Sequence, residues 1–167
     1  MVYISISYAA IVLFNIICIK LNKTVHTFAL VSNKIAIYRK EHFNAAHRLH
    51  NPSLTDEENS RIYGKCNRPN YHGHNYDLEV KLTGSVDERT GYVMDTKLLS
   101  DIIKEHILDV FDHNNLNTDV AALNGINPTT ENVAIAIYNI LRPKIDARLE
   151  LKIFLYETER NYVEYPA

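Results

Sequence analysis

Apolar and aromatic side chains recur at every second position in several stretches of the chain, which is typical of strands with one buried face. The stretch KIAIYRKEHFNAAHRL predicts a strand that ends near His47. A second strand begins at His72, because the alternate residues from there to Leu82 are histidine, tyrosine or aliphatic. Residues 149–157 alternate in the same way, and residues 161–165 predict a last short strand.

Between these strands the apolar spacing changes to that of helices. One helix is predicted from Thr96 to about Phe111, with its apolar stripe formed by Leu98, Leu99, Ile102, Ile103, Ile107 and Val110. A second helix is capped by Thr129 or Thr130 and runs to about Leu141, just before a proline.

Two shorter signals complete the pattern. The stretch TDEE has the form of a capping box, so a short helix is expected over Asp56–Tyr63, ended by Gly64. Gly84–Gly91 predicts a hairpin connection, after which Tyr92–Asp95 resumes the paired strand. Together the elements predict an α+β fold, with two helices on one face of a four-stranded antiparallel sheet.

Residues 1–33 differ from the rest, because Val2–Ile19 is an almost continuous apolar run. A signal peptide is disfavoured, since the lysines follow this run instead of preceding it. A membrane anchor is weakened by the serines and the asparagine within a run of near-minimal length. Our leading hypothesis is that translation starts later, near Leu30 or Val31, so that residues 34–167 form the single folded domain.

The composition of the chain limits the classes of binding partner that we expect. The 18 basic and 20 acidic side chains give a formal net charge of −2, which argues against nucleic acid or an anionic membrane as the main partner. An anionic substrate would therefore have to be met by a local cluster of cations. The two cysteines, Cys18 and Cys66, do not suggest a disulfide framework, so a cytosolic, reducing compartment is expected.

The motif H-G-H places His72 and His74 on one face of a strand, where both imidazoles can reach one metal ion. By itself the tripeptide is more typical of a turn with surface histidines. His47 changes this interpretation, because it ends the neighbouring strand if the two strands pair as a hairpin. Three neutral ligands leave one position open, so we predict a catalytic zinc site.

Cys66 lies in a polar loop beside Lys65 and Arg68, where cations favour a thiolate that acts as base or nucleophile. A buried structural thiol or a fourth, closing metal ligand fits its spacing equally well. Asp112 and His113 follow the long helix and suit a proton relay, although a histidine at a helix C-terminus is also common for electrostatic reasons.

Two carboxylates have both a chemical and an ordinary interpretation. Glu157 ends a strand on its apolar face, where it could accept hydrogen bonds from an amino-pyrimidine edge or form a strand-end salt bridge. Glu131 lies in the first turn of its helix, where acidic residues commonly stabilise the helix dipole.

Five blocks, FNAAHRL, GKCNRPNYHGHNY, LDVFDHNNLN, PTTEN and LYET, resemble in order the 6-pyruvoyltetrahydropterin synthase family, which includes the 6-carboxytetrahydropterin synthases of the queuosine pathway. The resemblance spans Lys34 to about Tyr165. It implies that zinc is held by His47, His72 and His74, and that the catalytic cysteine and the proton relay are Cys66, Asp112 and His113. It also implies that the pterin is bound by Glu157 and by the pocket-lining stretch Thr129, Thr130 and Glu131.

The family fold is a four-stranded antiparallel sheet with two helices on one side, called the T-fold. Family members assemble into barrels, commonly hexamers, with active sites at subunit interfaces. The implied reaction converts 7,8-dihydroneopterin triphosphate, with loss of triphosphate, to a 6-pyruvoyl pterin for tetrahydrobiopterin or a 6-carboxy pterin for queuosine, without a redox cofactor. Arg48, Lys65 and Arg68 are candidates for binding the triphosphate.

Two other functions remain compatible with the residues. A zinc-dependent hydrolase of a small phosphorylated or cyclic amide substrate would use three histidines and an activated water, with a general-base carboxylate near the metal. A non-enzymatic binding protein would hold the zinc for structure and use Cys66 as a further ligand.

Overall fold

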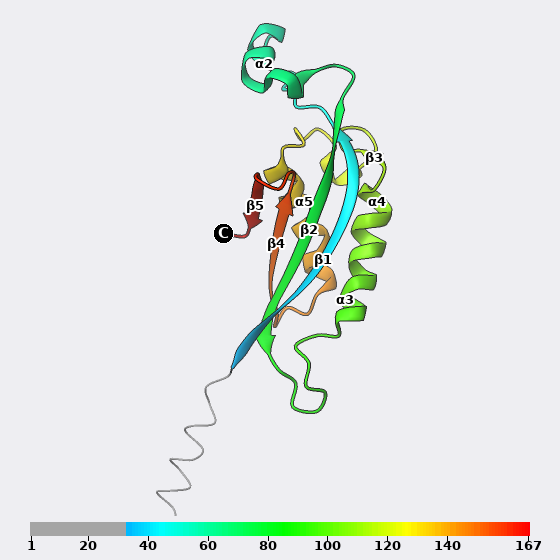
Figure 1. Cartoon of the computed structure of the whole chain (residues 1–167), viewed down its shortest axis with the longest axis vertical. Helices are drawn as coiled ribbons and strands as arrows, with labels where there is room; N and C mark the ends of the chain where they lie inside the picture. The colour runs from blue at the N-terminus through cyan, green and yellow to red at the C-terminus, as the bar shows by residue number, and fades with distance from the viewer. Residues whose placement is uncertain (1–32) are drawn as a thin grey trace, which may run out of the picture. The chain divides into compact units, whose positions relative to one another are not determined.

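Two long antiparallel strands, β1 (Lys34–His47) and β2 (His72–Ser85), run through the middle of the sheet (Figure 1). The computed structural model describes residues 33–167, so the predictions for the apolar segment before them lie outside the described residues. None of the helices within that range is long and apolar enough to cross a membrane. As predicted, β1 ends at His47 and β2 begins at His72, so both histidines lie at the same end of the sheet.

The sheet has five strands in the order β3-β1-β2-β4-β5. The strands β4 (Glu150–Tyr156) and β5 (Tyr162–Tyr165) are antiparallel to their neighbours, as predicted. The short strand β3 (Asn114–Asn115) pairs in parallel with β1, so the prediction of a four-stranded, purely antiparallel sheet was wrong. Two asparagines carry no apolar alternation, which is why the sequence pattern does not indicate this strand.

Tyr92–Asp95 does not form the predicted strand. Both edges of β2 are already paired, one with β1 and the other with β4, so no edge of β2 is free for it. The chain instead makes a turn in which the amide of Gly91 donates to Asp87 O at 2.8 Å and the amide of Asp87 donates to Tyr92 O at 2.9 Å.

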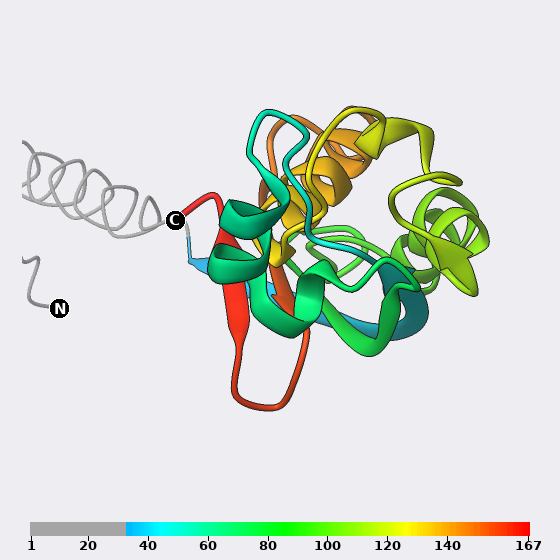
Figure 2. The same ribbon diagram turned by 90° about the horizontal axis from the view of Figure 1, so that it is seen from above.

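The helix α2 (Asp56–Tyr63) has the predicted bounds and the predicted capping box. The amide of Glu58 donates to Thr55 Oγ1 at 3.2 Å, and the amide of Thr55 donates to Glu58 Oε2 at 2.9 Å. The 3-10 segment η1 (Gly64–Asn67) follows directly and carries Cys66. This whole excursion projects beyond the end of the sheet (Figure 1), so α2 lies in front of the other elements when the molecule is viewed from above (Figure 2).

The first long helix is interrupted. It comprises α3 (Thr96–Ile103), a π-helical turn η2 (Lys104–Leu108) and α4 (Asp109–Phe111), and together these cover the predicted range. The second, α5 (Thr130–Leu141), has Thr129 as its N-cap, as predicted. Two single 3-10 turns, η3 (Ala121–Leu123) and η4 (Arg142–Lys144), flank α5.

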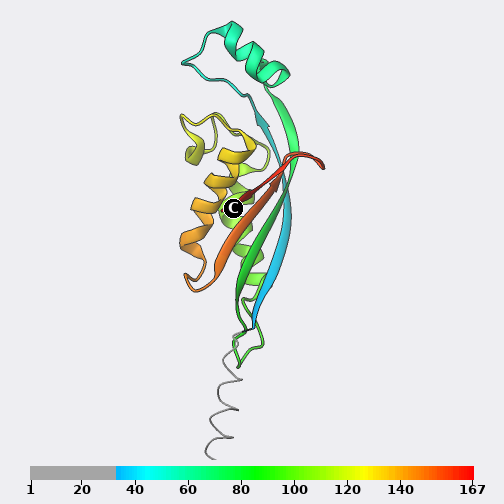
Figure 3. The ribbon, with the colours of Figure 1, turned by 90° about the vertical axis from the view of Figure 1, so that its left-hand side faces the viewer.

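The helices α3 and α5 lie against one face of the curved sheet (Figure 3). The hydrophobic core lies between this face and the helices. It contains buried side chains from the three central strands and from the helices. Phe43 stands at the centre, stacked on Tyr76 at 5.0 Å between ring centroids and edge-on to Phe111 at 5.7 Å. The other face carries charged pairs such as Lys40–Glu79. The α+β class and the helices on one face are confirmed.

Replacing Phe43 by alanine is expected to lower the free energy of unfolding by about 3–5 kcal/mol, because the ring is fully buried and a cavity remains. The matched control on the same strand is Tyr38→Ala, whose side chain is 50% exposed and should change stability by no more than about 0.5 kcal/mol. Urea unfolding of both variants measures the difference. Equal losses would contradict this assignment of the two faces.

Candidate functional site

The register of β1 and β2 brings three histidines together. His47 pairs with His72, and Ala45 pairs with His74, so the three imidazoles share one face of the sheet. Their ring centroids are 4.5 to 5.1 Å apart, and one nitrogen from each lies within 4.8 Å of the others. A side chain at Gly73 would lie 3.2 Å from Ala45 O, so the residue between the two histidines has little room for anything larger. The predicted trio is therefore a real cluster.

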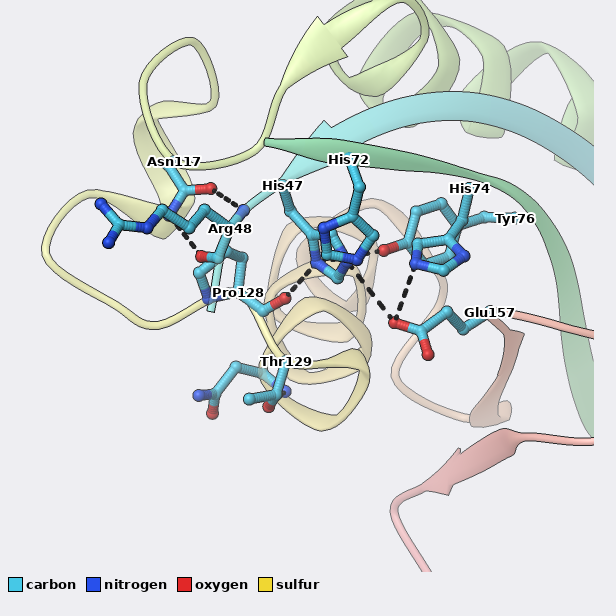
Figure 4. A network of polar contacts seen from close by, with 10 residues as sticks. His47, Arg48, His72, His74, Tyr76, Asn117, Pro128, Thr129 and Glu157 are labelled. Carbon is cyan, nitrogen blue, oxygen red and sulfur yellow. Dashed lines mark hydrogen bonds and ion pairs between the residues drawn. The ribbon is translucent and has the colours of Figure 1, made fainter. Parts of the chain in front are cut away.

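The surroundings of His47 suit a metal ligand. The side chain is fully buried, and its Nδ1 donates to Pro128 O at 2.9 Å (Figure 4). This bond fixes the proton on Nδ1 and leaves the lone pair of Nε2 facing His72 Nε2 at 3.1 Å. Burial lowers the pKa of both His47 and His72, which favours the neutral imidazoles that bind metals.

Two imidazole nitrogens of the cluster are buried without any hydrogen-bond partner, His72 Nδ1 and His74 Nε2. Buried polar atoms normally have a partner, so partnerless nitrogens in a group of three histidines fit a site that binds a metal ion. The donor set is three neutral nitrogens, which zinc accepts with a fourth position open for a substrate oxygen. The residues therefore fit a metal ion.

Glu157 lies beside the cluster, just past the end of β4. Its Oε1 is 3.7 Å from His47 Nε2 and 3.9 Å from His74 Nε2, and its side chain is 21% exposed. A cavity next to it is lined also by Thr130, Glu131 and Arg160. The structure therefore brings Thr130 and Glu131 to Glu157, as predicted.

Two residues of this region differ from the sequence-based interpretation. The Thr129 hydroxyl accepts from the amide of Asn132 at 3.4 Å, so it caps α5, and the residue is not among those that line the cavity. Arg160 is a cation of the cavity that sequence reasoning missed. The only available signal was its position three residues after Glu157, in the turn before β5.

Cys66 is a partly exposed free thiol in η1. Its carbonyl accepts from the amide of Leu49 at 2.9 Å, which ties the cysteine segment to the residues that follow β1. The group of possible metal ligands found among residues 33–167 contains the three histidines and does not include Cys66. This geometry argues against the reading of Cys66 as a fourth, closing ligand.

Asp112 and His113 form the predicted pair, with His113 Nδ1 2.9 Å from Asp112 Oδ2. The amide of Asn44 donates to Asp112 Oδ1 at 2.7 Å, and this bond, with His113 beside it, lowers the pKa of the Asp112 carboxyl. His113 is 78% exposed and has a φ of 59°, which is uncommon for a residue other than glycine.

The Asp112–His113 pair is not bonded to the three histidines within one chain. His113 lines a cavity with Asn44 and Asn75, and His74 borders the same cavity. In the part of the chain that the structure describes, no hydrogen bond or ion pair joins the pair to Cys66 or to the histidines. Within the described residues, the Asp112–His113 pair is therefore not bonded to the three histidines, although His74 borders the cavity that His113 lines.

Comparison with known proteins agrees with the five sequence blocks. The family model "6-pyruvoyl tetrahydropterin synthase" matches residues 36–167. A 6-pyruvoyl tetrahydrobiopterin synthase of Dictyostelium discoideum is 46% identical over 136 residues, which covers 81% of this chain and 98% of that protein. A 6-carboxy-5,6,7,8-tetrahydropterin synthase of Rickettsia typhi is 32% identical and covers 62% of this chain and 89% of its own length.

The fold agrees as well. The structure of 6-pyruvoyl tetrahydropterin synthase from Caenorhabditis elegans superposes with a TM-score of 0.75 at 39% sequence identity, covering 80% of this chain and 96% of that one. Together, these matches confirm the family that the sequence blocks indicate.

Lowering the pH from about 7.5 to about 5.5 is expected to destabilise the metal-free protein. Because burial lowers the folded pKa of His47 and His72 below the unfolded value of about 6.5, the unfolded chain takes up protons first as the pH falls through that value. Urea unfolding of chelator-treated protein measures the loss, which ends only when the folded imidazoles protonate. His72→Gln should weaken this pH dependence, and the control His106→Gln should keep it. A loss of stability that is the same in all three proteins would contradict the assignment.

Proposed function

Because the chain belongs to the 6-pyruvoyl tetrahydropterin synthase family, we propose that it is a zinc-dependent lyase acting on 7,8-dihydroneopterin triphosphate. The observation that carries the proposal is the histidine trio, with two partnerless buried nitrogens and a carboxylate within 3.9 Å. The reaction removes triphosphate from the side chain of the pterin and rearranges hydrogen atoms within the molecule. It is redox-neutral overall.

The product we propose is 6-pyruvoyltetrahydropterin, which is the precursor of tetrahydrobiopterin in the family. Sequence blocks leave the 6-pyruvoyl and 6-carboxy products open. The 46% identity to a protein named for the pyruvoyl product, against 32% to one named for the carboxy product, favours the former. The difference in coverage, 81% against 62% of this chain, points the same way.

His47, His72 and His74 would hold the zinc, which supplies Lewis acidity to the side-chain hydroxyls of the substrate and so acidifies the adjacent C–H and O–H groups. The Pro128 carbonyl keeps His47 in the tautomer that this task needs. Glu157 would accept two hydrogen bonds from the amino-pyrimidine edge of the pterin. Thr130 and Glu131 would line the same pocket, which places the ring beside the metal.

Cys66, as thiolate, would take the proton from the substrate carbon, and triphosphate would leave in the elimination that follows. Asp112 would orient His113, which would return or relay the proton. In this division the pair would serve the site of a neighbouring subunit, because no hydrogen bond or ion pair among the described residues joins Asp112 or His113 to the three histidines. We therefore propose a homo-oligomer, a hexameric barrel in the family pattern, with each site shared between chains. A free catalytic thiol also suits a reducing, cytosolic location.

Incubating the purified protein with 7,8-dihydroneopterin triphosphate should release triphosphate and change the absorption spectrum of the pterin. Cys66→Ala should keep the fold and the zinc content while turnover falls by at least about 100-fold, since a proton-transfer group contributes about 10²–10⁴-fold. Elemental analysis and chromatography of the products measure both. Phosphate release from an unchanged pterin would support the hydrolase instead, for which Glu157 beside the cluster is a suitable base. Loss of zinc together with Cys66 would support the binding protein.

Mixed oligomers test the shared site. Cys66→Ala and His113→Ala chains, each inactive alone, should regain a substantial fraction of wild-type turnover when co-expressed with different tags, because some interfaces then pair an intact Cys66 with an intact His113. The matched control combines Cys66→Ala with His74→Ala, which should stay inactive since both residues belong to the same half of the site. Absence of recovery in properly assembled mixed oligomers would contradict the proposal.

A further inference from the structure

We propose that Arg48 is a positioning residue whose guanidinium holds Asn67 and thereby sets where the Cys66 thiol lies relative to the three histidines. This inference rests on the proposed function, in which Cys66 takes the proton from the substrate. It gives Arg48 a role different from the one its charge suggests, which is to bind the triphosphate.

The segment that carries Cys66 has almost no hydrophobic anchor. From Arg48 to Tyr71 the one buried side chain is that of Asn59. Its amide nitrogen donates to the carbonyls of Asn51, Leu54 and Thr55 at 2.9 to 3.2 Å, so it organises the first half of the excursion and not η1. The position of Cys66 must therefore be fixed by polar contacts.

Arg48 supplies the main side-chain contacts that hold the end of η1. Its Nε donates to Asn67 O at 2.8 Å and its Nη2 donates to Asn67 Oδ1 at 3.1 Å. His50 Nδ1 lies 2.9 Å from the same Oδ1 and adds a second contact to Asn67. The two donors of Arg48 lie on one rigid plane and match two oxygens of one residue, an arrangement that lysine cannot reproduce.

Arg48 is itself held firmly. Its amide donates to Asn117 Oδ1 at 2.8 Å, and its carbonyl accepts from Asn117 Nδ2 at 2.9 Å. Its side chain runs away from the three histidines (Figure 4), so the guanidinium does not face them. The contacts of Arg48 with Asn67, called the clamp below, are therefore anchored on the residues that follow β1.

The clamp joins two pairs of consecutive residues. Arg48 directly follows the ligand His47, and Asn67 directly follows Cys66. The backbone bond from the Leu49 amide to Cys66 O, at 2.9 Å, runs beside it. Any shift of η1 relative to β1 therefore has to break the contacts of Arg48, and a shift of about 1 Å at a reacting group can cost about 100-fold in rate.

Steady-state kinetics of Arg48→Ala, Asn67→Ala and the double variant test this assignment, with the zinc content of each measured. We expect kcat to fall about 10–100-fold in each single variant, as is typical for groups that orient active-site residues, with KM within about twofold. The double variant should be no worse than the worse single one, because both changes remove the same contact. Arg48→Lys should be intermediate. The matched control is Arg61→Ala, an exposed arginine of α2, which should leave kcat unchanged.

A raised KM with an unchanged kcat in Arg48→Ala, together with a fully active Asn67→Ala, would overturn the proposal and make Arg48 a triphosphate contact. A second measurement separates this failure from failure of the proposed function. Hydrogen exchange at the Leu49 amide, whose acceptor is Cys66 O, should be at least about tenfold faster in Asn67→Ala than in the wild type even if the pterin triphosphate is not a substrate. Unchanged exchange in that variant would also overturn the proposal. Asn67 lies outside the buried core, so Asn67→Ala should remain folded even if Arg48→Ala were to unfold.

Discussion

The hydrogen-bond register between β1 and β2 is the constraint on which the site depends. Side chains alternate between the two faces of a strand, so a shift of one residue would move His72 and His74 to the face opposite His47. The two strands pair along fourteen residues each. Their register is fixed by the apolar residues that lie on the same face as the histidines and are buried in the core. The same alternation that buries Tyr76 and Leu78 therefore also aims the imidazoles, and folding and metal-site assembly have one cause.

The two faces of the sheet have different tasks. One face is covered by helices along most of its length and carries the three histidines at its end. The other face is polar, and the Asp112–His113 pair lies beside it. Under the proposed function, association of subunits would bring the Asp112–His113 pair of one chain to the histidines of another, and so would serve the chemistry as well as the stability.

Local signals in the sequence were sufficient for α2, for the start of α5 and for the face shared by the histidines, because capping boxes and period-two alternation depend on a few neighbouring residues. They were insufficient where the outcome depends on distant partners. Tyr92–Asp95 fails to pair because β4, more than fifty residues later, occupies the edge of β2. Likewise, β3 exists only because β1 offers it an edge, and the contacts of Arg48 with Asn67 join segments that no spacing rule connects.

The π-helical turn between α3 and α4 has a consequence for how such a site can diverge. A π-turn accommodates one more residue than an α-turn, and each residue of an α-helix advances by about 100° around the axis. The wide turn thus absorbs one extra residue locally, so the segments before and after it keep the directions that a regular helix one residue shorter would give them. Deleting one residue from Lys104–Leu108 would therefore restore a regular α-helix and leave Asp112 and His113 in their present direction. The length of this helix can change by one residue without moving this part of the site.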